Sequence, residues 1–390
     1  MAVHGAPALR RIESIDVVRG AIMILMALDH VRDFFTIPGL NPTNLAATTA
    51  PQFFTRWITH FCAPVFFCLM GTSAFLSGQR RTRSELSGFL LTRGLWLIVL
   101  ELTLVRCFAY QFNIDYQVTL LLVLWALGWS LVALSALVWL PTWLLTTIGL
   151  VMIAGHNALD SFRPASGLWN ILHAPGFVVT GPPFTVFASY PLIPWIGVTA
   201  AGYGLGQIYL WDTDRRRRFL LVAGVAITIG FVVLRWSNVY GDPRPWAAQS
   251  TALFSLLSFL NLNKYPPSLL FLMMTLGPAL LFLRTVDRQT PRFLQPARVY
   301  GQTPLFYFVL HFFTIHVLAV VVCYAKYGAV HWMFESPDLG NYPFTPPPGW
   351  GFPLPVIYAI WIGVVVAMYS ACLWMARLKA RRRAWWTSYV

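Results

Sequence analysis

The sequence predicts an all-α integral membrane protein with about ten transmembrane helices in one bundle. Hydrophobic residues make up 57% of the 390 residues, charged residues make up 11%, and the mean hydropathy is +0.62. A soluble domain of this length would not carry so apolar a surface. Apolar runs also recur at the length of about 20 residues that a helix needs to cross a bilayer. We therefore interpret residues 1–390 as a single polytopic domain.

Ten apolar segments predict the membrane helices. They lie at residues 15–35, 57–78, 93–111, 118–139, 143–158, 186–210, 219–235, 267–284, 301–324 and 354–376. Residues 246–262 predict a further helix that lies on the outer surface or dips into it. The segments between the helices that we expect outside are long and rich in Pro, Gly, Trp and Tyr. Loops of this composition suit a substrate mouth, or interfacial anchoring by their aromatic residues.

The positions of the basic residues predict the orientation. With the N-terminus in the cytoplasm, the inside segments hold 19 of the 28 Lys and Arg residues. These are Arg10, Arg11, Arg80, Arg81, Arg83, Arg93, Arg215 to Arg218, Arg284, Arg288, Arg292, Arg298, Arg377, Lys379 and Arg381 to Arg383. Such a bias is typical of cytoplasmic loops, so both termini are expected inside, with residues 1–13 and the basic tail 377–390 in the cytoplasm. The net charge of +14 then reflects topology, and no nucleic-acid partner is expected.

The first apolar segment, SIDVVRGAIMILMALDHVRDFF (residues 14–35), contains Arg19 and His30. Eleven residues are almost three helical turns, so both side chains project from one face, about 16 Å apart along the axis. An ionisable group in a membrane helix is costly unless it faces a protein interior or a water-filled cavity. The spacing therefore predicts a polar pathway through the bundle.

Further ionisable residues lie inside or at the ends of other apolar segments. Glu101 and Arg106 are five residues apart, so they face different sides of an α-helix and either form ion pairs to other helices or line the pathway. His60 begins the second segment at the expected outer surface, where a substrate would arrive. Lys264 precedes two prolines at a membrane mouth and could bind a substrate or anchor the interface.

His311 and His316 lie in the ninth segment, five residues apart. This spacing is poor for a shared metal ion, because two imidazoles on one helix face need a spacing of four. His311 lies deeper and is the better candidate for lining a cavity, with core packing as the alternative.

The cysteines and the standard nucleotide and metal motifs point to no other chemistry. The five cysteines lie in or beside apolar segments without paired spacing, so neither a disulfide framework nor a zinc site is indicated. They are Cys62, Cys68, Cys107, Cys323 and Cys372. The sequence has no phosphate-binding loop, no dinucleotide-binding fingerprint and no HExxH motif. No metal cofactor is expected.

Several sequence blocks resemble a known family. The spacing of Arg19 and His30 is similar to the Arg/Lys-x10-His pattern of the acyltransferase family 3 proteins, and SIDVVRG is similar to the opening of transmembrane acyltransferases more widely. Four more blocks resemble bacterial relatives of the heparan-alpha-glucosaminide N-acetyltransferase catalytic domain. These are THFCAPVFFCLMGTSAFL (residues 59–76), YPLIPWIGVTAAGYGLG (residues 190–206), NKYPPSLLFLMMTLGPALLF (residues 263–282) and YGQTPLFYFVLHFFTIH (residues 300–316).

The resemblance implies transfer of an acyl group, usually acetyl, from cytoplasmic acetyl-CoA to a hydroxyl or amine of an extracytoplasmic carbohydrate or glycoconjugate. It implies residence in the bacterial cytoplasmic membrane and leaves a homodimer open. In the acyltransferase 3 pattern the histidine is the proposed catalytic residue, a role that carries over onto His30. The lysosomal enzymes instead place an asparagine there and use a histidine in the following lumenal loop. Residues 36–59 of this chain contain no histidine, which leaves His30 and His60 as the nearest candidates.

The residues of the first segment suit this chemistry. A histidine of ordinary pKa near 6.5 can take the proton from an attacking hydroxyl at neutral pH. Asp33, three residues on, lies on the same side of the helix and is the better candidate to orient His30. Asp29 points about 100° away but stays a candidate, because it could serve a different helix. Arg19 is placed to bind the phosphates of CoA through its forked donors. The alternatives are a buried His30 bonded to a backbone carbonyl and an Arg19 that pairs with Asp16 as a topology anchor.

Two questions stay open at the level of sequence. Arg80 and Arg81 are topology signals or additional ligands of the CoA phosphates. The same buried charges would also serve a proton-coupled transporter or flippase, which would favour repeated halves with broken helices at matching positions. No such symmetry is visible, so the acyltransferase is the preferred interpretation.

Overall fold

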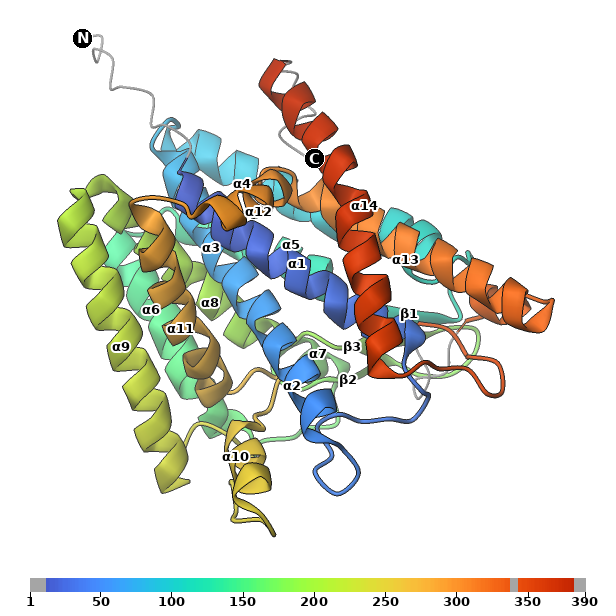
Figure 1. Ribbon diagram of the computed structural model, residues 1–390. Helices are drawn as coiled ribbons and strands as arrows, with labels where there is room; N and C mark the ends of the chain where they lie inside the picture. Colours follow the sequence, from blue (N-terminus) through green and yellow to red (C-terminus); the bar gives the residue numbers. More distant parts are fainter. Residues whose placement is uncertain (1–11, 337–342, 382–390) are drawn as a thin grey trace.

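The computed structural model describes residues 12–336 and 343–381, and its architecture is predominantly helical (Figure 1). Most of the predicted N-terminal segment and the end of the basic tail lie outside the described residues. The helices are α1 (Glu13–Phe35), α2 (Ala50–Ile58), α3 (Cys62–Gly78), α4 (Arg83–Leu100), α5 (Val123–Leu137), α6 (Thr142–Gly155), α7 (Gly167–Leu172), α8 (Leu192–Leu205), α9 (Thr213–Ser237), α10 (Ala252–Leu260), α11 (Leu269–Asp287), α12 (Gln295–Gly301), α13 (Pro304–Tyr327) and α14 (Leu354–Arg381). Short 3₁₀ segments are η1 (Thr59–Phe61), η3 (His156–Leu159), η4 (Gly206–Leu210), η5 (Arg292–Leu294) and η6 (His331–Phe334), while η2 (Glu101–Tyr110) is a π-helix.

Each of the ten predicted membrane segments contains a helix. Within the described residues, seven helical stretches are long and apolar enough to cross a membrane. They are Ala50–Gly78, Arg83–Tyr110, Thr142–Leu159, Thr213–Ser237, Leu269–Asp287, Pro304–Tyr327 and Leu354–Arg381. The other three predicted segments correspond to α1, which carries several charges, and to α5 and α8, which have 15 and 14 residues. An integral membrane protein is thus confirmed, and a total of ten crossing helices stays a prediction.

Helix α1 occupies the centre of the bundle. It packs against α3, α11, α12, α13 and α14 (Figure 1), and 15 of its 23 residues are buried. Neighbouring helices, rather than lipid, therefore surround the polar side chains of α1, which is the environment in which charged groups persist at membrane depth.

Glycines allow α12 to approach α1 closely. A Cβ atom on Gly20 would lie 1.7 Å from the carbonyl oxygen of Ala297, and one on Gly301 would lie 1.8 Å from that of Asp16. Small residues permit such backbone contact between membrane helices. The contact brings the end of α12 against the first turns of α1, beside Arg19.

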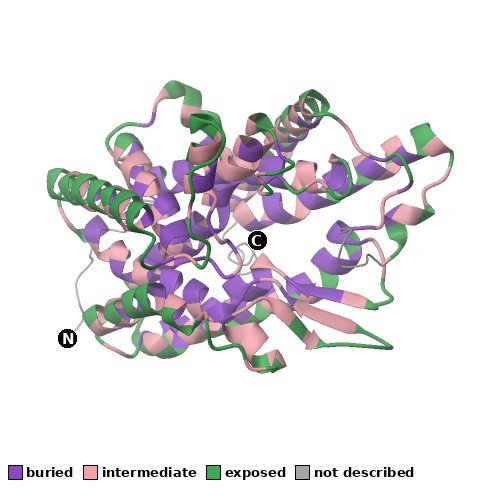
Figure 2. Cartoon of the chain, turned by 90° about the horizontal axis from the view of Figure 1, so that it is seen from below, coloured by how far each residue is buried: buried purple, intermediate pink, exposed green. Residues whose placement is uncertain are grey.

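The peripheral helices present apolar side chains outward. Exposed residues on α9 include Val222, Ile229 and Val233, and those on α14 include Ile362 and Val366. Figure 2 shows buried residues gathered in the middle of the bundle and exposed residues on its outer faces. Large exposed apolar faces on long helices are expected where lipid, not water, is the surrounding solvent.

A small sheet interrupts the otherwise helical chain. Strands β1 (Val118–Leu121) and β3 (Thr185–Ala188) pair in parallel, and β2 (Gly176–Val179) pairs with β3 in antiparallel fashion. The predicted segments 118–139 and 186–210 therefore begin too early, because their first residues belong to strands. Short apolar runs do not distinguish a strand from a helix by periodicity.

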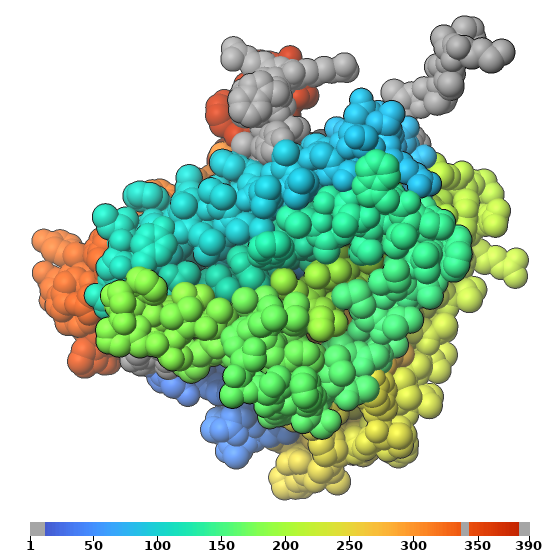
Figure 3. All heavy atoms as spheres, turned by 180° about the vertical axis from the view of Figure 1, so that it is seen from behind, coloured from blue at the N-terminus to red at the C-terminus, as the bar shows by residue number. Residues whose placement is uncertain are grey.

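Residues 246–262, which the sequence predicts as a helix at the outer surface, contain a shorter helix. Helix α10 spans Ala252–Leu260, and the side chain of Thr251 accepts a hydrogen bond from the backbone N–H of Phe254 at 3.2 Å. This N-cap defines where the helix begins. In the space-filling view of Figure 3, the chain from α4 to the sheet covers the rear of the bundle, and the α10 region projects at one end.

Candidate functional site

A cavity of about 320 Å³ extends along one face of α1. Arg19 and His30 both line it, as their spacing predicts. Its other walls are mostly apolar and come from α3, α4, α5 and α13. The further lining residues are Met26, Asp29, Cys62, Ala63, Phe66, Met70, Ser73, Ala74, Ser77, Phe89, Leu90, Arg93, Leu97, Val123, Leu124, Leu127, Leu131, Tyr190, Lys264, Pro304, Leu305 and Phe308. We call this space the inner cavity.

Arg19 is held in place at one end of the inner cavity. Its guanidinium donates to the hydroxyl of Ser73 at 2.8 Å, to the carbonyl of Gly301 at 3.2 Å and to Asp16 at 3.3 Å. The ion pair between Arg19 and Asp16, which was predicted as the alternative to a role in CoA binding, is therefore present. It does not remove Arg19 from the cavity, because the side chain still lines the wall.

Two more arginines lie at this end. Arg93 lines the inner cavity directly. From the sequence, Arg93 was predicted only to mark a cytoplasmic segment. Arg81 is exposed, hydrogen-bonds Ser77 and stacks over the ring of Phe89 at 4.3 Å. Ser77 and Phe89 are both wall residues, so Arg81 borders the cavity. Arg80 is exposed and lines neither of the two cavities of the site.

Asp29, at the other end, is the hub of a cluster of cations. Its carboxylate contacts Arg56 through a short ion pair, Arg32 at 3.0 Å and Lys264 at 3.7 Å, and accepts a hydrogen bond from Thr59 at 2.9 Å. The side chain of Asp29 is only 11% exposed. Asp29 and Lys264 are among the candidates predicted from the sequence, whereas Arg32 and Arg56 are not, because no local pattern distinguishes them from other arginines near helix ends.

His30 lies beside this cluster without a hydrogen bond to it among the described residues. Its Nδ1 atom is buried and has no hydrogen-bond partner within residues 12–336 and 343–381. The expected orienting carboxylate, Asp33, instead pairs with Arg32 at 2.6 Å. The ring of His30 contacts Phe312 and His311 edge-on, with centroid distances of 4.0 and 5.1 Å. Packing against α13, rather than a carboxylate, therefore orients the imidazole.

His311 supports His30 from α13. Its Nδ1 donates to the carbonyl of Tyr307 at 2.9 Å, which leaves Nε2 as an acceptor without a partner in the described chain. His311 is fully buried and lines neither cavity. His316 has a separate environment, because it bonds the Met333 carbonyl at 2.8 Å.

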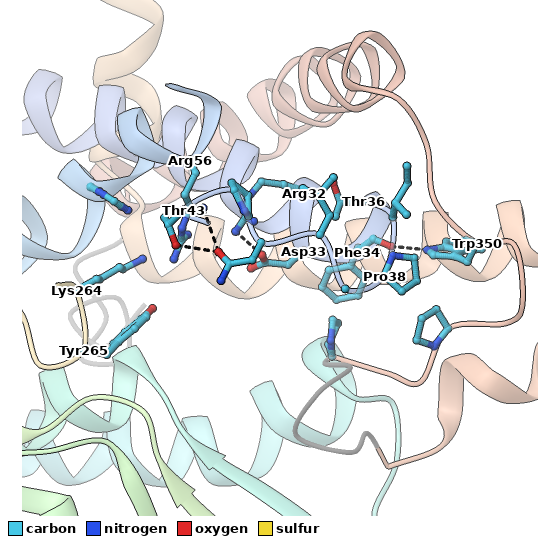
Figure 4. Close-up of a pocket in the computed structure, with 18 of the residues that line it drawn as sticks. Arg32, Asp33, Phe34, Thr36, Pro38, Thr43, Arg56, Lys264, Tyr265 and Trp350 are labelled. Atoms are coloured by element: carbon cyan, nitrogen blue, oxygen red, sulfur yellow. Dashed lines mark hydrogen bonds and ion pairs between the residues drawn. The ribbon is translucent and has the colours of Figure 1, made fainter. Parts of the chain in front are cut away.

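A second cavity, of about 550 Å³, lies at the end of α1. In Figure 4, Lys264 and Tyr265 lie at one end of this outer pocket, Trp350 at the other, and Arg32 and Asp33 between them. The remaining lining residues are Phe34, Thr36, Ile37, Pro38, Gly39, Leu40, Asn41, Pro42, Thr43, Arg56, His60, Arg244, Leu262, Asn263, Pro343, Phe344 and Pro346. Lys264 lines both cavities, so the two meet at the Asp29 cluster.

Polar and aromatic residues of the outer pocket come from segments far apart in sequence. His60 lines this pocket and packs on the ring of Phe271, with centroids 5.2 Å apart. Burial alone would raise the pKa of Tyr265, but the charges of Lys264 and Arg56 outweigh it and hold that pKa below its ordinary value. No local sequence signal indicates this environment of Tyr265.

Glu101 and Arg106 have structural contacts and line neither cavity. Glu101 accepts hydrogen bonds from the backbone N–H groups of Leu122 and Trp125, at 3.2 and 2.7 Å, at the start of α5. Arg106 donates to the carbonyls of Asn113 and Val118 at 2.9 and 3.1 Å. The segment is a π-helix, so a face argument based on α-helical spacing does not apply. A role for either residue in the pathway is therefore not supported.

The fold and the two cavities define a helical membrane protein in which a largely apolar cavity and a polar pocket share Lys264 beside the central helix. A sequence model described as "Heparan-alpha-glucosaminide N-acetyltransferase, catalytic" matches residues 11–240, more than half of the chain. The chain belongs to this family, which implies a membrane acetyltransferase. The matched region includes Arg19, Asp29, His30 and His60, whereas Lys264 lies beyond it. No curated protein matches the chain.

Proposed function

We propose that the protein transfers an acetyl group from cytoplasmic acetyl-CoA to a hydroxyl or amine of a carbohydrate or glycoconjugate outside the membrane. The observation that carries this proposal is the meeting of two different cavities at Lys264, with His30 on the wall of the inner one. The largely apolar inner cavity has arginines at its Arg19 end, and the polar outer pocket lies at the opposite end of α1. Family membership supplies the reaction class, and the two cavities supply separate places for donor and acceptor.

The inner cavity suits an acyl-CoA. Arg19, Arg93 and Arg81 surround one end, where the phosphates of CoA would bind to guanidinium donors. The apolar wall between them and His30 suits the thioester arm, which carries no charge. This direction requires the Arg19 end to face the cytoplasm, in agreement with the distribution of basic residues.

The outer pocket suits a polyhydroxyl acceptor with an anionic group. Hydroxyl groups need both donors and acceptors, and the pocket offers guanidinium, ammonium, amide and carboxylate groups together with aromatic rings. Among the described residues, four cations line it, which are Arg32, Arg56, Arg244 and Lys264. Against these four, the described chain places Asp33 in the pocket and Asp29 beneath it, which leaves an excess of positive charge. That excess would favour an acceptor that carries a carboxylate, sulfate or phosphate.

His30 is the proposed general base. The acceptor oxygen or nitrogen attacks the thioester carbonyl carbon while His30 takes its proton, and the C–S bond then breaks. The departing thiolate recovers the proton from His30 and leaves as CoA. Lys264, which faces both cavities, would stabilise the negative charge on the carbonyl oxygen. The resemblance of the Arg19–His30 spacing to the acyltransferase 3 pattern supports this role.

Labelled acetyl-CoA tests the reaction. Purified protein in nanodiscs is given acetyl-CoA carrying a radiolabelled acetyl group, together with glycans extracted from a bacterial envelope. We expect CoA release that depends on the glycans, and label on the glycan fraction. Label confined to acetyl-CoA, with release no faster than in empty nanodiscs, would contradict the proposal.

Orientation has its own test. Single cysteines at Arg80 and Asp214 should resist a membrane-impermeant thiol reagent in intact cells, because both positions are expected in the cytoplasm. A cysteine at Ala165, in an outer loop, should react and serves as the control. All three positions are exposed, so access depends on the side of the membrane. Labelling at Asp214 but not at Ala165 would contradict the orientation.

Arg19 is expected to serve donor binding. Arg19→Ala should weaken acetyl-CoA binding, measured by calorimetry, by about 10-fold or more, since a charge-assisted bond is worth about 1.5–3 kcal/mol. Arg19→Lys should recover only part of the affinity because the forked geometry is lost. Arg288→Ala is the control, because Arg288 is exposed and lines neither cavity. Unchanged affinity in Arg19→Ala would make Arg19 an anchor.

A further inference from the structure

Two histidines and an aspartate come together away from the proposed acetyl-transfer site. His156 begins η3 at the end of α6, Asp160 follows η3, and His173 follows α7. One potential ligand atom from each lies within 4.8 Å of the others. His156 is 2% exposed and His173 is 1% exposed. Two imidazoles and a carboxylate are thus gathered in a buried place.

The hydrogen bonds of this cluster are incomplete. His173 Nε2 and Asp160 Oδ1 are 3.1 Å apart, but His173 Nδ1 has no partner and neither ring nitrogen of His156 makes a hydrogen bond among the described residues. The backbone carbonyl of Pro267 interacts with the His156 ring. Buried polar atoms are normally paired, so unpaired ones call for an explanation.

We propose that His156, Asp160 and His173 bind a divalent transition-metal ion, with Zn²⁺ as the best fit. Imidazole nitrogen and carboxylate oxygen are ordinary zinc ligands, and three protein ligands leave a fourth position for water. Binding would replace the contact between His173 and Asp160 with bonds to the metal and would use ring nitrogens that are now unpaired.

Hydrogen bonds hold the carboxylate of Asp160 in place. The side-chain amide of Asn157 donates to Asp160 Oδ2 at 2.9 Å, while Asp160 Oδ1 lies 3.1 Å from His173 Nε2. The carboxylate is therefore oriented toward the imidazole of His173.

A metal ion at this site would also fix the position of the segment that carries Lys264. The side chain of Asn157, next to His156, accepts a hydrogen bond from the backbone N–H of Leu269 at 2.8 Å. Pro267, beside the His156 ring, lies in the same short segment between Lys264 and α11. A metal would therefore hold the end of α6, α7 and this segment together. The consequence for Lys264 rests on the proposed function, whereas metal binding itself does not.

The test measures zinc directly. Protein carrying no polyhistidine tag is stripped with a chelator, incubated with ZnCl₂, dialysed and analysed by mass spectrometry for bound zinc. We expect about one zinc per chain, with X-ray absorption showing only N and O ligands at about 2.0–2.2 Å. The double variant His156→Asn/His173→Asn should lose this zinc. His331→Asn is the matched control, because His331 also lies near a carboxylate, that of Glu335 at 3.9 Å, but is exposed.

A folding control keeps the result interpretable. Asp160→Asn removes only a charge and should weaken zinc binding by at least about 10-fold even if the double variant is poorly folded. Zinc should also raise the unfolding temperature of the wild type more than that of Asp160→Asn. Less than one zinc in the wild type, or equal zinc in the wild type and Asp160→Asn, would overturn the proposal regardless of whether acetyl transfer is found.

Discussion

Replacing His30 by alanine is expected to lower acetyl-transfer turnover by about 10²–10⁴-fold, the usual worth of a general base. His30 lines the inner cavity beside the Asp29 cluster, and its Nδ1 has no hydrogen-bond partner in the described part of the chain. Affinity for acetyl-CoA should change little, because the arginines at the far end of the inner cavity would bind the phosphates. Single-turnover rates with labelled acetyl-CoA measure the first quantity, and calorimetry measures the second.

The pH profile and a matched variant complete this test. A base must be neutral to accept a proton, so the wild-type rate should fall as the pH drops through the pKa of the base, and the residual rate of His30→Ala should lose that dependence. His331→Ala, at an exposed position, should keep the wild-type rate and profile. An alanine variant of His30 with more than about a tenth of wild-type turnover would contradict its role as base and direct attention to His60 or His311.

Asp29→Asn is expected to destabilise the protein by about 3–5 kcal/mol, the range for removing one partner of a buried ion pair. The variant keeps the shape of the side chain but leaves Arg56, Arg32 and Lys264 without their shared counter-charge. Asp33 compensates only Arg32, to which it is already bound. Equilibrium unfolding in mixed micelles measures the change in free energy of unfolding.

A surface pair provides the comparison for Asp29. Glu335 pairs with His331 at 3.9 Å, and both side chains are more than half exposed. Glu335→Gln should therefore change the free energy of unfolding by no more than about 0.5 kcal/mol. Equal stability of Asp29→Asn and the wild type would mean that the three cations are solvated individually, and the cluster would no longer explain the position of Lys264.

Sequence patterns were sufficient for the membrane class and for the first functional residues. Helix-length apolar runs recur because each membrane helix must satisfy its own backbone and contact lipid or other helices. Arg19 and His30 line one cavity because eleven residues of a regular helix return to the same face. The same reasoning failed at Glu101 and Arg106, where a π-helix replaces the assumed geometry, and at Val118–Leu121, where an apolar run forms a strand.

The partners of these residues depend on the tertiary structure. Asp33 was expected to orient His30 because the two are three residues apart, but Arg32 is closer to Asp33 and carries the opposite charge. Lys264 reaches Asp29 from 235 positions along the chain, and His173 meets Asp160 across a loop. No local sequence pattern predicts these contacts, because the packing of helices and the conformation of loops bring the segments together. Helical periodicity was enough to predict that Arg19 and His30 share one face of α1, whereas the contacts of each residue depend on how the other helices pack around α1.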